Sequence, residues 1–274
     1  MTFRFLGTGT SVGVPQIGCD CHVCTSRDPR DRRNRCGAYV STDSGAFLID
    51  TPPELRIACL EYGIKRVDAV LLTHAHMDHI ADFDDIRRFN TINGTRIPCD
   101  PDSPGANGRT FRIEGKPLPC YALPDTIDQM HHIFPYISDR GGAMGLFRPQ
   151  IVFRDNVEPF EVAGIRVEAL KVEHGFPCCG YLFDGALGYI SDCHVIPDET
   201  IEKLRGVDTM VLNCLRVREH PTHLGRDRCL EYIRRIKPRR AYLVHMCHDF
   251  THEEWLGMLP KGVEPAYDGL ELDI

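Results

Sequence analysis

The sequence predicts an α/β fold in which two βα halves stack sheet to sheet within one domain, residues 1–274. Strand patterns separated by turn signals occur early in the chain and return from Ile151. Helical patterns close both groups of strands. No internal repeat or low-complexity tract divides the chain, and 42% apolar residues among 274 suffice for a large core. This succession of strands and helices is typical of layered α/β domains.

The first half begins with antiparallel strands. Asp43-Ser44-Gly45 is a turn signal between two strand patterns and therefore predicts a hairpin. The proline pair 52–53 precedes a stretch of helical spacing. The expected elements are a strand through Phe3 and Phe5, strands 37–41 and 46–50, a helix over 54–62 and a buried strand over 69–73.

Residues 93–118 are rich in Gly, Pro, Asn and Asp, and we expect them to form an irregular insertion. A helix is expected over 125–134, with Asp125 as its cap. The elements expected after it are strands 151–154, 165–172, 180–183, 187–191, 207–213 and 239–245, and helices 199–204 and 225–236.

Composition excludes several classes of protein. A net charge of −7, from 32 basic and 39 acidic residues, provides no protein-wide positive field for nucleic acid. No apolar run approaches the ~20 residues of a membrane span. Thirteen cysteines, an odd number in a long chain without a signal-peptide pattern, favour thiols and metal ligands over disulfides. We therefore expect a cytoplasmic protein without a membrane partner.

The stretch His74-Ala75-His76-Met77-Asp78-His79 places four ligand-type side chains within six residues, directly after a predicted strand. On an extended segment His74, His76 and Asp78 project to one side, and a turn at Asp78-His79 redirects the last two. The stretch therefore predicts a site that two metal ions share. The alternative, a solvated polar loop, requires this spacing to arise by chance.

A second cluster, Cys19-Asp-Cys21-His-Val-Cys24, offers three thiolates in a loop bounded by glycine. A closed tetrahedral zinc site needs a fourth ligand, and His248 is our choice for it, with Cys247 as the rival. Such a site leaves no position for a substrate, so we expect a structural zinc.

The His-x-His-x-Asp-His stretch resembles the signature of the metallo-β-lactamase superfamily. The resemblance implies an αββα sandwich, with two mixed β-sheets flanked by helices. It also implies that further ligands follow later strands. The ligand set it implies is His74, His76 and His174 for one metal, Asp78, His79 and His245 for the other, and Asp192 as the bridge.

Three features narrow the resemblance to the phosphonate-pathway cyclic-phosphate phosphodiesterases, which are PhnP-like enzymes. They are Gly7-Thr-Gly-Thr-Ser-x-Gly13, the cysteine loop 19–24, and His245-Met-x-His248-Asp. We expect Gly7 to Gly13 to bring backbone close to the metal site or to structure the zinc loop; a simple packed turn is the alternative. The resemblance also implies a pocket-covering segment, so insertion and lid together are expected over about 93–150.

The resemblance assigns His223 a place near the substrate phosphate, as candidate general acid, with His220 as competitor. A histidine near its ordinary pKa of ~6.5 can protonate a leaving alkoxide at neutral pH. The catalytic residues we expect are Asp78, Asp192 and His223.

The function expected is a metal-dependent phosphodiesterase acting on a small or cyclic phosphodiester, such as a nucleotide or ribosyl phosphate. Two divalent ions, Zn or Mn, would activate a hydroxide for in-line attack. Alternatives are a ribonuclease of the transfer-RNA 3′-processing type, a thioesterase or lactonase on the same dinuclear site, and a non-enzymatic zinc-stabilised binding module. We expect a small phosphodiester or nucleotide as partner rather than polymeric nucleic acid, and the sequence leaves a homodimer open.

Overall fold

The computed structural model describes residues 1–103, 108–138 and 149–274. Its strands are β1 (Thr2–Gly7), β2 (Gly37–Ser41), β3 (Ala46–Ile49), β4 (Ala69–Leu71), β5 (Thr95–Pro98), β6 (Phe111–Glu114), β7 (Leu118–Ala122), β8 (Ile151–Asp155), β9 (Phe160–Val162), β10 (Ile165–Lys171), β11 (Cys179–Phe183), β12 (Leu187–Ile190), β13 (Thr209–Asn213), β14 (Arg240–Val244), β15 (Val263–Pro265) and β16 (Glu271–Asp273). Its helices are α1 (Leu55–Glu61), α2 (Met77–Ile80), α3 (Arg87–Ile92), α4 (Pro124–Ile133), α5 (Pro135–Ser138), α6 (Asp198–Leu204), α7 (Arg226–Ile236) and α8 (His252–Met258), with 3₁₀ turns η1 (Pro29–Asp31) and η2 (Phe83–Ile86). Within these ranges no helix has the length and apolarity needed to cross a bilayer.

Two seven-stranded sheets form the centre of the molecule. Their strand orders are β16-β1-β2-β3-β4-β7-β8 and β15-β14-β13-β12-β11-β10-β9. Each sheet is antiparallel at one end and parallel at the other, since β3, β4, β7 and β8 pair in parallel and so do β12 to β15. The two expected mixed sheets are therefore confirmed.

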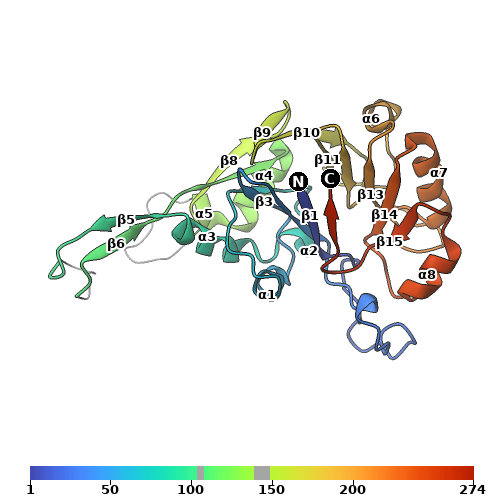
Figure 1. Ribbon diagram of the computed structural model, residues 1–274, viewed down its shortest axis with the longest axis horizontal. Coiled ribbons are helices and arrows are strands. Elements are labelled where there is room, and N and C mark those ends of the chain that lie inside the picture. The colour runs from blue at the N-terminus through green and yellow to red at the C-terminus, as the bar shows by residue number, and fades with distance from the viewer. Residues whose placement is uncertain (104–107, 139–148) are drawn as a thin grey trace.

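The sheets face each other across one apolar layer, and helices cover their outer faces (Figure 1). Alternate residues of a strand point to opposite sides, so each strand supplies two layers. In β3, Phe47 and Ile49 pack between the sheets while Leu48 packs under the helices of its own half. In β13, Val211 points inward and Met210 packs with the helices of the second half. The αββα sandwich is confirmed.

The segment after α3 differs from the expectation of an irregular insertion. Residues 95–98 and 111–114 form the antiparallel hairpin β5–β6, which reaches away from both sheets (Figure 1). The strand β7, inside the range expected to be insertion and lid, pairs with β4 and β8 in the first sheet. Its short apolar run follows Pro117, and long-range pairing rather than local pattern makes it a strand. Residues 104–107 and 139–148 of that range lie outside the described residues.

The helix expected over 125–134 is present as α4, but Asp125 does not cap it. Leu123 is the N-cap, without a side-chain hydrogen bond, and Pro124 opens the helix. A proline at the first helical position has no N–H to satisfy and already has helical φ, so the helix starts two residues earlier than it would with Asp125 as its N-cap.

Candidate metal centre

The expected ligands lie at the carboxyl ends of strands from both sheets. His74 follows β4 of the first sheet, and His174, Asp192 and His245 follow β10, β12 and β14 of the second. Because carboxyl ends of parallel strands share one edge, the opposed sheets bring these side chains to one place.

The histidine stretch changes direction as expected, but the turn is helical and begins one residue before Asp78, so Asp78 does not continue the extended segment. The chain is extended as far as His76, and helix α2 begins at Met77. Asp78 and His79 therefore lie in a helical turn. The change of backbone direction redirects these two side chains: the ring of His79 lies beside that of His74, with centroids 4.3 Å apart, and His79 also groups with Asp78 and His245.

Three imidazole nitrogens converge in the first group. Nδ1 of His76 lies 2.9 Å from Nε2 of His74 and 3.4 Å from Nε2 of His174. His74 and His174 are buried, and His76 is partly open to a cavity. The three nitrogens suit one divalent ion.

The second group consists of Asp78, His79 and His245, whose ligand atoms lie within 4.8 Å of one another. The carboxylate of Asp192 lies between the groups: Oδ2 is 3.1 Å from Nε2 of His79, and Oδ1 is 3.4 Å from Nδ1 of His245. Asp192 also forms a group with His74 and His79. The structure thus brings together the seven residues that the resemblance implied.

Asp50 orients this cluster, and the sequence analysis did not include it. Its carboxylate accepts a hydrogen bond of 2.7 Å from Nδ1 of His79 and one of 2.8 Å from the hydroxyl of Thr73. The Thr73 hydroxyl in turn accepts from Nδ1 of His74, at 2.9 Å. Both histidines therefore keep Nε2 free for a metal, the usual arrangement around metal-ligating histidines. The available sequence signal was an aspartate at the end of a predicted strand. In the structure Asp50 adopts a φ of 61°, in the left-handed region.

Unpaired buried atoms test whether an ion fits. Within the described residues, Nε2 of His79, both ring nitrogens of His245 and Oδ2 of Asp192 are buried without a hydrogen-bond partner. Buried polar groups are ordinarily paired, because leaving them unpaired costs free energy. Lone pairs facing one another in this way fit divalent cations of the Zn or Mn kind.

The protonation states also suit metal binding. Burial lowers the pKa of His74, His76 and His245, so these imidazoles are neutral, as a ligand must be. Burial alone would raise the pKa of Asp192, but His245 and His79 hold it well below its usual range. Against the effect of burial, the carboxylates of Asp192 and Asp50 raise the pKa of His79. The raised pKa means that the ring of His79 holds a second proton. A divalent ion held by His79 and Asp192 would displace this proton.

A cavity of 290 Å³ opens onto the cluster, and His223 lines it. The His223 ring stacks on His245, with centroids 4.7 Å apart, and its Nδ1 lies 3.5 Å from Oδ1 of Asp192. His220 does not line this cavity; its ring lies 5.3 Å from that of His223. Burial lowers the pKa of His223 to about 3, below the ordinary value at which a free histidine can act as an acid at neutral pH.

Four further residues line the cavity to which the sequence analysis gave no role of their own: Ser11, Gly175, Phe176 and Thr222. Phe176 stacks on His76 with centroids 4.5 Å apart. Ser11 stands in the glycine loop, whose backbone packs against Met246 and the strand-like residues 33–35. A Cβ at Gly9 would lie 2.6 Å from the carbonyl oxygen of Arg33, so only glycine allows this approach. The loop thus lies beside both metal-type clusters.

The cysteine loop is the second cluster. Nδ1 of His248 lies 3.3 Å from Sγ of Cys19 and of Cys24 and 3.4 Å from Sγ of Cys21. The backbone N–H of Cys24 donates to Sγ of Cys21 and lowers the pKa of that thiol to about 6, whereas burial raises the pKa of Cys24 to about 11. In the described part of the chain His248, and not Cys247, joins the three thiols. This donor set matches a closed tetrahedral zinc site.

Replacing one of these thiols tests the zinc assignment. We expect Cys21→Ser to reduce tightly bound zinc by one equivalent and to lower Tm by at least ~5 °C, because structural zinc contributes several kcal/mol and ~1 kcal/mol shifts Tm by about 2–4 °C in a chain of this size. Elemental analysis and a thermal melt measure both. Cys99→Ser, on the β5–β6 hairpin, is the control. Unchanged zinc content and Tm in Cys21→Ser would show that the assignment is wrong.

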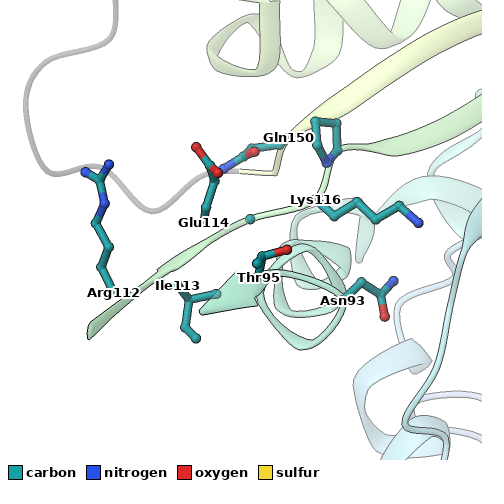
Figure 2. A pocket seen from close by; sticks show the side chains of 9 residues that line it. Asn93, Thr95, Arg112, Ile113, Glu114, Lys116 and Gln150 are labelled. Atoms are coloured by element: carbon teal, nitrogen blue, oxygen red, sulfur yellow. The ribbon is translucent and has the colours of Figure 1, made fainter. Parts of the chain in front are cut away.

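A larger cavity, of 700 Å³, lies at the base of the β5–β6 hairpin (Figure 2). It shares no lining residue with the cavity at the His/Asp cluster. Among the described residues that line it, Arg112, Glu114 and Lys116 are charged, and none is a histidine or cysteine. As far as the structure describes its lining, the larger cavity therefore lacks the metal-ligand side chains that line the cavity at the His/Asp cluster.

Comparison with known proteins agrees with this geometry. The family described as "Beta-lactamase superfamily domain" matches residues 46–246. An octanoyltransferase of Porphyromonas gingivalis is 34% identical over 273 residues, which cover 97% of this chain and 50% of that protein. The chain therefore spans about half the length of this curated relative.

Two solved structures extend the comparison. A structure described as a new diphosphatase from the PhnP family has 37% sequence identity and a TM-score of 0.84, covering 100% of this chain and 97% of that one. Zn²⁺-bound PqqB from Methylobacterium extorquens has 19% identity and a TM-score of 0.70, with both chains fully covered. At that identity the second similarity shows the fold alone.

Proposed function

Because the chain belongs to the beta-lactamase superfamily, we propose that its His/Asp cluster is the active site of a metal-dependent phosphodiesterase. Membership of the superfamily and the similarity to a PhnP-family diphosphatase support a hydrolase. The proposed substrate is a small or cyclic phosphodiester, such as a nucleotide or a ribosyl phosphate.

One observation carries the proposal: Asp192 stands between two groups of three ligand-type side chains. We assign one divalent ion to His74, His76 and His174 and another to Asp78, His79 and His245, with Asp192 shared. Divalent ions of the Zn or Mn kind supply a Lewis acid and lower the pKa of water.

Other residues of the chain orient the ligands and contact the substrate. Asp50 fixes the rings of His79 and, through Thr73, of His74. His223 lines the cavity beside Asp192, and this position supports a role in binding a phosphoryl oxygen or in giving a proton to the leaving oxygen. An anionic substrate favours the protonated ring and so opposes the effect of burial on His223.

The size and charge of the surroundings favour a small substrate. A cavity of 290 Å³ is at the lower end of ligand-site volumes. The β5–β6 hairpin is the projecting arm of the described structure, but residues 95–114 carry three arginines against Asp100, Asp102 and Glu114. An arm without net positive charge gives little attraction for transfer RNA.

Acyl chemistry is the second candidate, because the relative from Porphyromonas gingivalis bears the name of an octanoyltransferase. That name describes a protein twice as long as the matched region, and a metal site can activate attack on a carbonyl as well as on phosphorus. A thioester must therefore be assayed beside the phosphodiester.

Metal analysis followed by hydrolysis of bis(p-nitrophenyl) phosphate tests the proposal. We expect one tightly bound zinc, up to two exchangeable ions, and diester hydrolysis that a mild chelator removes and added Mn²⁺ or Zn²⁺ restores, while circular dichroism shows an unchanged fold. A diphosphate ester, an octanoyl thioester and transfer RNA at several salt concentrations are the parallel substrates. Hydrolysis of the thioester without the diester would contradict the phosphodiesterase and support acyl chemistry.

A further inference from the structure

The two metal-type clusters share one short segment of chain. His245 belongs to the His/Asp cluster, and His248, three residues later, belongs to the cysteine loop. The backbone between them continues through Phe250 to helix α8. Whatever fixes this segment acts on both clusters at once.

Arg33 contacts the segment between His245 and helix α8 through two backbone carbonyls. Its side chain is fully buried; Nη1 donates to the carbonyl of Cys247 at 2.7 Å, and Nη2 donates to the carbonyl of Phe250 at 3.2 Å. These carbonyls stand on either side of His248. The planar guanidinium therefore spans the turn that carries this ligand.

Asp31 connects Arg33 and the start of helix α8 to the cysteine loop. Its carboxylate, nearly buried, lies 3.6 Å from Nη2 of Arg33 and accepts from the hydroxyl of Ser26 and from the backbone N–H of His252, both at 2.6 Å. Val14 and Arg33 exchange two backbone hydrogen bonds of 2.8 Å at the base of the loop. The loop between β1 and β2, which projects beside α8 (Figure 1), is thus closed at its base by Asp31 and Arg33.

The conformation of His245 links the Asp31 and Arg33 contacts to the His/Asp cluster. His245 has a φ of 59°, in the left-handed region that a residue with a side chain adopts only when its surroundings hold it there. The next residue, Met246, exchanges hydrogen bonds with Thr8 and Thr10, and Cys247 is held by the N–H it donates to Leu215 and by Arg33. The direction of the His245 ring therefore depends on the segment after it.

We propose that Asp31 and Arg33 form a positioning clamp that couples the cysteine-loop site to His245, and so sets the affinity of the Asp78/His79/His245 group for its divalent ion. The inference rests on the metal centre in the proposed function. The clamp touches neither ion nor substrate, so its residues are positioning residues. Loosening it weakens the second group and leaves the His74/His76/His174 group as it is.

Arg33→Lys tests the clamp, because lysine keeps the charge but cannot span two carbonyls with a planar fork. Titration of the protein with Mn²⁺, followed by electron paramagnetic resonance, gives the Kd of each exchangeable ion without any activity measurement. We expect one of the two Kd values to rise about tenfold, the low end of the effect of supporting residues on metal affinity, while tightly bound zinc is retained. Saturating Mn²⁺ should restore kcat.

Arg30→Lys is the matched control, because Arg30 lies next to Asp31 in the 3₁₀ turn η1 and pairs with Asp28; it should change neither Kd. If Arg33→Lys does not fold, Asp31→Asn receives the same titration, since it keeps an acceptor for His252 but loses the charge that faces Arg33. Two unchanged Kd values, or loss of zinc and stability with both values unchanged, would overturn the clamp. Failure of the unaltered protein to bind exchangeable Mn²⁺ would instead refute the proposed function.

Discussion

Asp192→Ala is expected to lower kcat for phosphodiester hydrolysis by at least ~10³-fold. Asp192 is shared by both proposed metal groups, so its loss removes a ligand from each. Metal coordination supplies several kcal/mol of transition-state stabilisation, and each ~1.4 kcal/mol is tenfold in rate. His76→Ala should lose activity in the same way through the first group alone. Steady-state kinetics with bis(p-nitrophenyl) phosphate at saturating Mn²⁺ measures the effect.

Asp43→Ala provides the control for Asp192→Ala. Asp43 is an exposed aspartate in the turn between β2 and β3, at the far end of those strands from Asp50, and its replacement should leave kcat unchanged. Circular dichroism and a thermal melt should show that Asp192→Ala is folded, because ligands of this kind serve the reaction rather than the core. Full activity in a folded Asp192→Ala or His76→Ala protein would exclude the two-metal assignment.

His223→Ala is expected to lower kcat by ~10²–10⁴-fold for diesters with poor leaving groups, the usual range for loss of a general acid. The loss should shrink for a p-nitrophenyl ester, because p-nitrophenolate departs with little help from a proton donor. The metal content should stay the same, since His223 lies outside the two groups of three assigned to ions. Kinetics with an alkyl and a p-nitrophenyl diester separate the two cases.

His220→Ala is the matched control for His223→Ala, because its ring is a neighbour of the His223 ring but does not line the cavity. An equal loss with both leaving groups in His223→Ala would make that histidine a phosphate-binding residue instead of an acid. No loss with either substrate, together with a loss in His220→Ala, would move the role to His220.

The strand and helix pattern was largely predictable where local signals are strong. The hairpin of β2 and β3 follows from Asp43-Ser44-Gly45, and the αββα layers follow from the resemblance carried by His74 to His79. The hairpin β5–β6 and the central strand β7 were not predictable in this way. Gly and Pro around 93–118 indicate loop, whereas pairing with β4 and β8 depends on residues distant in sequence.

In the candidate site, too, the residues that support the ligands were not predictable from local sequence patterns. Asp50 supports His79 across 29 residues, and Phe176 stacks on His76 across 100; neither spacing has a local period that a sequence pattern reveals. The same holds for Arg33, a basic residue in a charged stretch that the structure buries completely against residues more than 200 positions away. Such contacts come from the closure of two sheets, and composition gives no sign of them.

The sequence by itself determined the candidate metal ligands, because four ligand-type residues lie within six positions and the others follow strands in the order that the resemblance implies. Only the tertiary structure decided which of them meet. The turn into helix α2 at Met77 brings His79 beside His74 and Asp192, and His245 adopts the left-handed conformation just before the segment that leads to His248. Ligand identity is a property of residue type, whereas convergence requires the carboxyl ends of two opposed sheets to be brought to one edge, and packing of the whole core does that.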